Sequence, residues 1–157
     1  MSHRADPLRL AELLLDTVFS LKREEGKTVR RALAFTLGVG LGANSIWMLL
    51  APETWYHAVP GVADTGPMNL HFIRDIGCAY FVVALSLVRL ARSPMHAWPA
   101  TLAGGAFLAL HAVVHVWDFR TGREHAHGFL NDLPGVFFPA ILTLWLAWPP
   151  RPGPKMG

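Results

Sequence analysis

Hydrophobic residues fall in four long runs separated by short polar stretches. The runs cover about residues 32–51, 69–90, 98–118 and 130–148. Each is close to the roughly 20 residues that a helix needs to cross about 30 Å of hydrocarbon. A surface helix of a soluble bundle would carry a polar stripe, and residues 41–51 and 78–88 carry almost none. The pattern therefore predicts an all-α integral membrane four-helix bundle, with a kink in the last span at Pro139.

The first 31 residues follow a different pattern. Leucine and valine recur at helical spacing after Asp6-Pro7, a pair that offers an N-cap and a proline at the first helical position. Glu24-Glu25-Gly26 offers an end, because glycine often follows the last residue of a helix. We therefore predict an amphipathic helix over residues 7–24. It would lie on the inner membrane surface, or pack on the bundle or on a partner.

These patterns divide the chain into three parts. Residues 1–31 form a cytoplasmic or interfacial arm, residues 32–148 the transmembrane domain, and residues 149–157 a cytoplasmic tail. The spans also offer packing motifs, GxxxG at Gly38 and Gly42 and a small-xxx-small pair at Ala100 and Gly104. Such motifs allow close helix approach, either within the chain or at a dimer face. The single cysteine, Cys78, excludes an internal disulfide and is predicted to pack.

Lysine and arginine are distributed unevenly about the four runs. Of fourteen, eleven lie in the N-terminal arm, near the loop 91–97 or in the C-terminal tail. The opposite side has only Arg120 and Arg123, and Arg74 lies within a run. The positive-inside rule therefore places both termini in the cytoplasm, in the inner membrane of a bacterial cell. The net charge of +3 follows from this topology, so the predicted partner is the lipid bilayer rather than nucleic acid, and a homo-oligomer or a larger membrane complex stays open.

Ionisable side chains gather near the outer ends of the second and third runs. They are His71, Arg74 and Asp75 in one and His111, His115 and Asp118 in the other. At about 100° per residue each group shares one helix face, and antiparallel pairing sets the two groups at similar depth. Charged groups are costly in a membrane, so they are usually paired or functional. We predict a metal site with His71, Asp75, His111 and His115 as ligands for zinc, copper or iron.

Other polar residues have supporting roles in this prediction. Arg74 and Asp118 would orient the ligands or hold an anionic substrate, and His125 and His127 would supply a further ligand or guide an ion. Several alternatives stay open. The cluster could be a metal-free substrate or proton site, a haem site with one axial histidine from each helix, or a set of purely structural ion pairs and hydrogen bonds.

The start of the second run carries a resemblance. With its four short helices and the segment Asn69-Leu70-His71-Phe72-Ile73-Arg74-Asp75-Ile76-Gly77, the chain resembles the DoxX-like bacterial membrane proteins over roughly residues 32–148. The resemblance implies a small four-helix membrane protein from a group in which some members are linked to quinone- or sulfur-coupled oxidoreduction. It carries no activity over to this chain, because the His111/His115 pair matches no shared catalytic motif.

The sequence as a whole predicts a membrane protein with a His/Asp metal site near its outer face, with redox activity as one option. The alternatives are a non-catalytic accessory subunit of a membrane complex and a haem- or quinone-linked electron-transfer subunit. Whether the protein is an enzyme stays open at this point.

Overall fold

A computed structural model describes residues 7–123 and 126–149 of the chain. Within these residues the fold is helical throughout, without a strand. The elements are α1 (Pro7–Leu50), α2 (Pro52–Ala58), the 3₁₀ turn η1 (Val62–Asp64), α3 (Leu70–Arg92), α4 (Pro94–Arg120), α5 (Ala126–Asp132), the π-helical turn η2 (Leu133–Phe137) and α6 (Phe138–Leu146).

Four segments of this fold are long and apolar enough to cross a membrane. They are Leu14–Leu50, Leu70–Arg92, Pro94–Arg120 and Gly128–Leu146. Many large apolar side chains remain exposed along them, as expected of surfaces that face lipid tails instead of water. The predicted all-α, multi-pass membrane fold is confirmed, and the protein contacts the bilayer through these helices.

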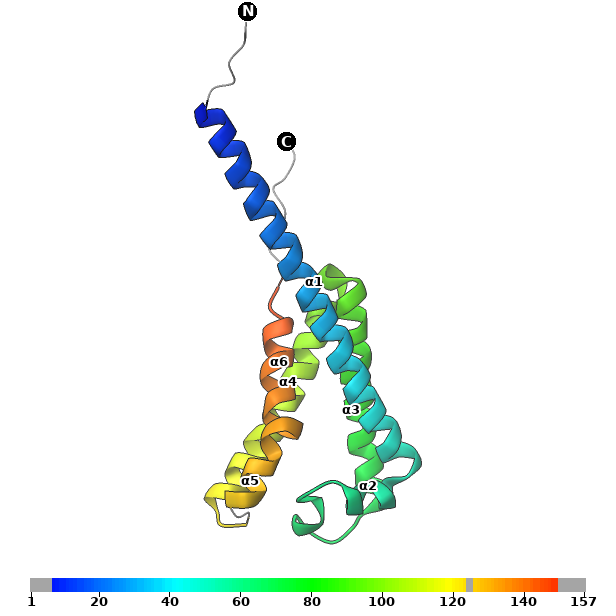
Figure 1. Cartoon of the computed structure of the whole chain (residues 1–157). Coiled ribbons are helices and arrows are strands. Elements are labelled where there is room, and N and C mark those ends of the chain that lie inside the picture. Colours follow the sequence, from blue (N-terminus) through cyan, green and yellow to red (C-terminus); the bar gives the residue numbers. More distant parts are fainter. Residues whose placement is uncertain (1–6, 124–125, 150–157) are drawn as a thin grey trace, which may run out of the picture.

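The helices pack in chain order. Helix α1 lies along α3, α3 along α4, and α4 along α6. The turn between α3 and α4 and the end of α6 lie at one end of the bundle, which we call the proximal end (Figure 1). Helix α2, η1 and the turn after α4 lie at the other, distal end. Toward the distal end the α1/α3 pair and the α4/α5/α6 group diverge (Figure 1).

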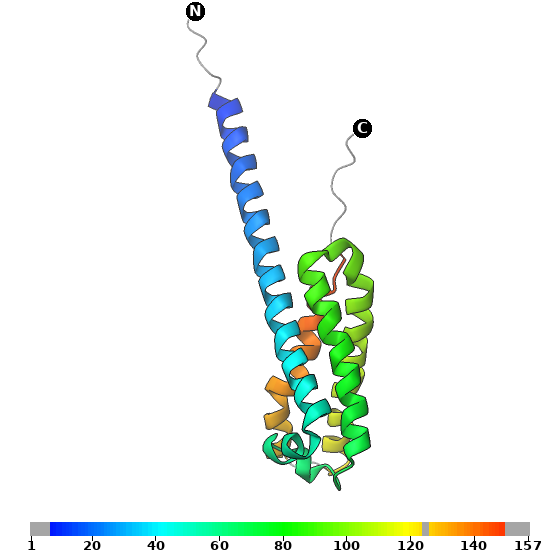
Figure 2. The ribbon, with the colours of Figure 1, turned by 90° about the vertical axis from the view of Figure 1, so that its right-hand side faces the viewer.

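Helix α1 is one continuous helix of 44 residues, so the predicted end at Gly26 is wrong. A glycine inside a helix costs only about 1 kcal/mol relative to alanine, and local contacts span this one. Lys27 Nζ lies 2.6 Å from Glu24 Oε1, and Thr28 Oγ1 donates to the Glu24 carbonyl at 3.0 Å. The N-terminal part of α1 therefore projects beyond the proximal end instead of turning to lie across it (Figures 1 and 2).

Small residues set the distances between the helices. A Cβ added at Gly38 would lie 3.1 Å from the Ala84 carbonyl oxygen of α3, and one added at Gly77 would lie 3.0 Å from Met48 Cβ of α1. At Gly105 of α4, an added Cβ would lie 2.8 Å from a leucine side chain of α6. The GxxxG motif could serve packing within the chain or a dimer face. The close approach of Gly38 to α3 is packing within the chain.

Residues 52–68, which connect the first two apolar runs, are ordered by side chains of the distal end. Trp55 Nε1 donates to Asn44 Oδ1 of α1 at 2.9 Å, and the Tyr56 hydroxyl donates to the Gly66 carbonyl at 2.7 Å. These bonds fasten α2 and the following turn to the end of α1. The loop therefore forms a cap over this side of the bundle.

The last span is interrupted where prolines occur. The π-helical turn η2 includes Pro134, and α6 begins one residue before Pro139. Proline lacks an N–H and its ring clashes with a carbonyl of the preceding turn, so a wider turn accommodates it. The interruption expected at Pro139 is present as this π turn.

Arg30 fastens α1 to α6 at the proximal end. Its Nη2 donates to the Leu146 carbonyl at 2.9 Å and to the Trp148 carbonyl at 3.2 Å. The guanidinium also lies 5.3 Å from the centre of the Trp145 ring. A cation here satisfies carbonyls that the end of a helix leaves without partners.

Candidate functional site

The α3 group predicted as part of the metal site points outward. His71 Nε2 lies 3.4 Å from Asp75 Oδ2, and the two side chains are 89% and 60% exposed. Val82 and Leu85 continue the same face and are also exposed. The inward face of α3 is formed by other residues, which are all buried: Ile73, Gly77, Tyr80, Val83 and Ala84.

The α4 group, in contrast, turns partly inward. His111 and His115 are each half-buried, with ring centroids 4.8 Å apart. Leu108 and Ala112 beside them are buried. This face of α4 therefore looks partly into the bundle. A four-residue spacing on one helix has brought two imidazoles into edge-to-face contact.

Aromatic rings surround His111. The Tyr80 ring of α3 meets it edge-on, with centroids 6.1 Å apart, and the Phe107 ring stacks on it at 6.3 Å. Tyr80 thus occupies the position opposite His111 at which Asp75 was expected. The physical reason is the face of α3: Tyr80 lies on the buried side and Asp75 on the exposed side.

The partner of His115 is Asp132, a residue that the sequence analysis missed. His115 Nδ1 lies 2.6 Å from Asp132 Oδ2, and the side chains are only 19% and 13% exposed. Asp132 ends α5, so the contact joins α4 to the last span. The available signal was a lone carboxylate just before Leu133-Pro134 at the start of the fourth apolar run.

The residues predicted to support the metal ligands have other partners. Arg74 Nε donates to the Leu49 carbonyl at the end of α1, at 3.3 Å. Asp118 lies 3.4 Å from Arg123 Nη1, beyond the histidine pair. Residue His125 lies outside the described residues. His127 belongs to α5, but its side chain is outside the described part of the structure.

The four predicted metal ligands do not form one group. Among the side chains that the structure describes, no three from histidine, cysteine, aspartate or glutamate converge to hold a metal ion. His71 and Asp75 pair with each other on the exposed face of α3, while His111 and His115 contact Asp132, Tyr80 and Phe107. The prediction of a shared site fails because the two polar faces do not point toward one another.

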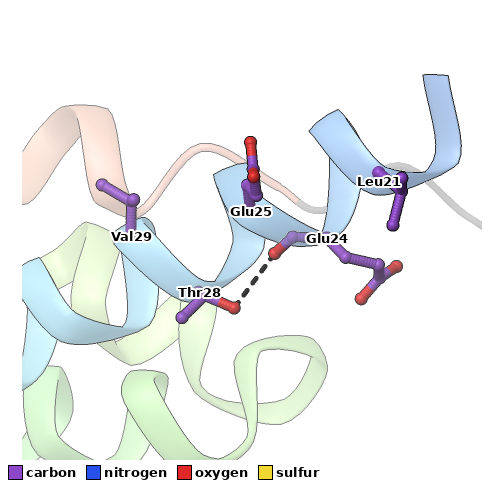
Figure 3. Close-up of a pocket in the computed structure, with 5 residues that line it drawn as sticks. All are labelled: Leu21, Glu24, Glu25, Thr28 and Val29. Atoms are coloured by element: carbon purple, nitrogen blue, oxygen red, sulfur yellow. Dashed lines mark hydrogen bonds between the residues drawn. The ribbon is translucent and has the colours of Figure 1, made fainter. Parts of the chain in front are cut away.

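A shallow hollow lies on the projecting part of α1, away from these residues. It is lined by Leu21, Glu24, Glu25, Thr28 and Val29, all from the projecting part of α1 (Figure 3). All five side chains are exposed, and the hollow follows the surface of a single helix. It lacks the convergent polar groups that mark a ligand site.

Fold and site together define a multi-pass helical membrane protein with a shielded His–Asp pair near the distal end of its bundle. No protein-family model matches the chain, and searches of curated proteins and of solved structures also gave no match.

Proposed function

We propose that His111, His115 and Asp132 form a binding site for a membrane-soluble hydroxylated ring compound of the quinol class, and that His115 accepts its proton. The observation that carries the proposal is the 2.6 Å contact between His115 Nδ1 and Asp132 Oδ2 in a shielded position.

The Asp132 contact sets the chemistry of the His115 ring. A neutral imidazole that donates from Nδ1 to a carboxylate presents the lone pair of Nε2 as an acceptor. Nε2 has no hydrogen bond to any described residue. A ligand hydroxyl could donate to it, and the proton could move from oxygen to Nε2. The carboxylate would then stabilise the imidazolium that forms.

The surroundings favour a ligand that arrives through the bilayer. Leu110 and Val114, between and beside the histidines along α4, are 69% and 55% exposed. An amphipathic ring with a polar edge could therefore lie among apolar side chains while its hydroxyl reaches His115. His115 would take up one proton from the bound ring, and the chain would act as the ligand-binding subunit of a membrane complex.

Ligand binding in lipid nanodiscs tests this proposal. Decylubiquinol should bind the full chain saturably under anaerobic conditions. His115→Ala and Asp132→Asn should each weaken binding about 10-fold or more, as expected for a hydrogen bond to a charged group. His71→Ala, which changes an imidazole of the exposed pair, is the matched control and should bind like the wild type. Absent binding, or equal binding in all four proteins, would contradict the proposal.

A second candidate is a zinc, copper or iron site, favoured by one feature. His111 and His115 supply two neighbouring imidazoles, and a carboxylate that holds Nδ1 of a ligating histidine is the usual outer partner in metal sites. His125 and His127 remain predicted further ligands. Elemental analysis should find metal in the wild type and none in His111→Ala plus His115→Ala; near-zero metal in both would end this candidate. A Soret band would instead indicate haem.

We also propose that the proximal end faces the cytoplasm of a bacterial cell. Seven lysines and arginines of the described residues lie near that end: Lys22, Arg23, Lys27, Arg30, Arg31, Arg89 and Arg92. Only Arg120 and Arg123 lie at the tip of α4. In a Cys78→Ser background, a membrane-impermeant maleimide should label Asp64→Cys in intact cells and Ser20→Cys only after permeabilisation. The reverse pattern would invert the topology.

A further inference from the structure

An apolar stripe runs along nearly the whole length of α1. Its large side chains are all between 47% and 80% exposed. They are Leu14, Val18, Leu21, Phe35, Val39, Ile46 and Leu50. At 100° per residue these positions share an arc of about 100°. The stripe begins on the projecting part of α1 and continues through the membrane-spanning part.

The stripe is separate from the face that packs on α3. Ala34, Gly38 and Ser45 are buried against α3, and their positions lie about 100–140° around the helix from Leu21 and Val39. The surface is thus additional to the contacts that hold the bundle together.

The stripe is longer than the hydrocarbon core of a membrane can cover. At about 1.5 Å per residue, α1 is roughly 66 Å long, about twice the thickness of the hydrocarbon core. Half of the helix therefore extends past the bundle (Figures 1 and 2). A single amphipathic helix is marginal in water without packing of its apolar face. Leu14, Val18 and Leu21 need a partner outside the membrane.

The spacing of the stripe indicates what that partner is. The positions 14, 18, 21, 25, 28, 32, 35 and 39 follow alternating steps of four and three, the heptad pattern of a coiled coil. Two copies in one membrane have the same orientation, so their α1 helices run parallel. We propose that α1 pairs along this stripe with α1 of a second copy, forming a parallel two-stranded coiled coil that continues into the bilayer.

The available area is sufficient for such a dimer. Seven half-exposed large side chains contribute about 100 Å² each, or roughly 1,400 Å² over two copies. A specific interface needs about 1,200–2,000 Å². Two core positions are polar, Glu25 and Thr28, and both lie just above the membrane part. Polar core residues lower the stability of a coiled coil and restrict its register, so Glu25 is the weak point of the pairing.

Cysteine cross-linking tests the geometry. In a Cys78→Ser background the full chain is reconstituted in liposomes at high dilution and exposed to a mild oxidant. Leu21→Cys should form disulfide-linked dimers at least 10-fold faster than Phe19→Cys. Phe19 is the matched control, since it is apolar, 66% exposed and at the same height, but lies about 160° away around the helix. Equal rates at both positions, or no dimer at either, would overturn the proposal.

A second measurement follows the dimer itself. Energy transfer between labelled copies in liposomes reports the apparent affinity of the pairing. This affinity should fall at least 10-fold for Leu21→Asp, remain unchanged for Phe19→Asp and rise for Glu25→Leu. All three positions lie outside the packed bundle, so helix content and span packing should be retained. The proposal would be refuted if Phe19→Asp also lost pairing. It would also be refuted if pairing needed another protein in native membranes, because the stripe would then bind a different partner.

Discussion

Two His–Asp pairs occur near the distal end of this bundle, and their surroundings differ. His71 and Asp75 lie 3.4 Å apart with side chains 89% and 60% exposed. His115 and Asp132 lie 2.6 Å apart, with side chains 19% and 13% exposed. The residue types are the same in both pairs. What differs is the structure that brings them together.

The first pair needs only a helix, because residues four apart on α3 are neighbours on its surface. The second pair joins residues 17 apart in sequence and needs α4 and α5 to pack. A contact that depends on tertiary structure is shielded by it, and shielding strengthens its electrostatics. The comparison teaches that burial, not the residue pair, marks the candidate site.

The largest expected difference is in the free energy of unfolding. Asp132→Ala removes the partner of a shielded imidazole and should destabilise the protein by about 1.5–3 kcal/mol. Asp75→Ala removes half of an exposed pair and should change stability by at most about 0.5 kcal/mol. Equilibrium unfolding in mixed detergent–SDS micelles measures both variants. Equal changes in the free energy of unfolding would show that burial does not make the second pair more stabilising than the first.

Double-mutant cycles sharpen the comparison by isolating each pair. The cycle of His115→Ala with Asp132→Ala should give a coupling free energy of about 1–2 kcal/mol, because the interaction is shielded and short. The cycle of His71→Ala with Asp75→Ala should give a value near zero. The same unfolding assay supplies all the measurements. A coupling near zero for the first pair would mean that Asp132 acts through packing alone.

Arg30 extends the comparison to the proximal end, where a cation meets carbonyls instead of a carboxylate. Arg30→Ala should destabilise the protein by about 1 kcal/mol, since it leaves the last carbonyls of α6 without their donor. Arg31→Ala changes the exposed neighbouring residue and is the matched control. If both variants unfold alike, the contact between α1 and α6 does not contribute to stability.

Much of this fold could be predicted from the pattern of apolar residues. The four runs are long and almost free of charge, and the last three lie within about four residues of the segments Leu70–Arg92, Pro94–Arg120 and Gly128–Leu146. The first boundary was wrong because a single glycine at position 26 does not end a helix when contacts from residue 24 span it. Gly26, which suggested a helix end, lies inside the continuous helix α1 instead.

The candidate site was only half predictable. Helical spacing placed His111 and His115 on one inward face, because that relation is local. Their partner could not be found in the same way, since it depends on how α4 meets the last span. The outward turn of His71 and Asp75 has a related cause: α3 uses Gly77 and Tyr80 for packing, and both lie on another face. Spacing within a helix is therefore more informative than pairing between helices.

The smallest expected effect concerns salt, and it depends on the same comparison. The distance over which salt screens charge falls from about 10 Å at 0.1 M to about 3 Å at 1 M. Any coupling between His71 and Asp75 should disappear over this range, a change of about 0.3 kcal/mol or less, because both side chains are exposed. The coupling between His115 and Asp132 should persist, because little water or salt reaches a pair that is so shielded. Double-mutant cycles at the two salt concentrations measure both, and equal salt dependence would show that solvent reaches the second pair as freely as the first.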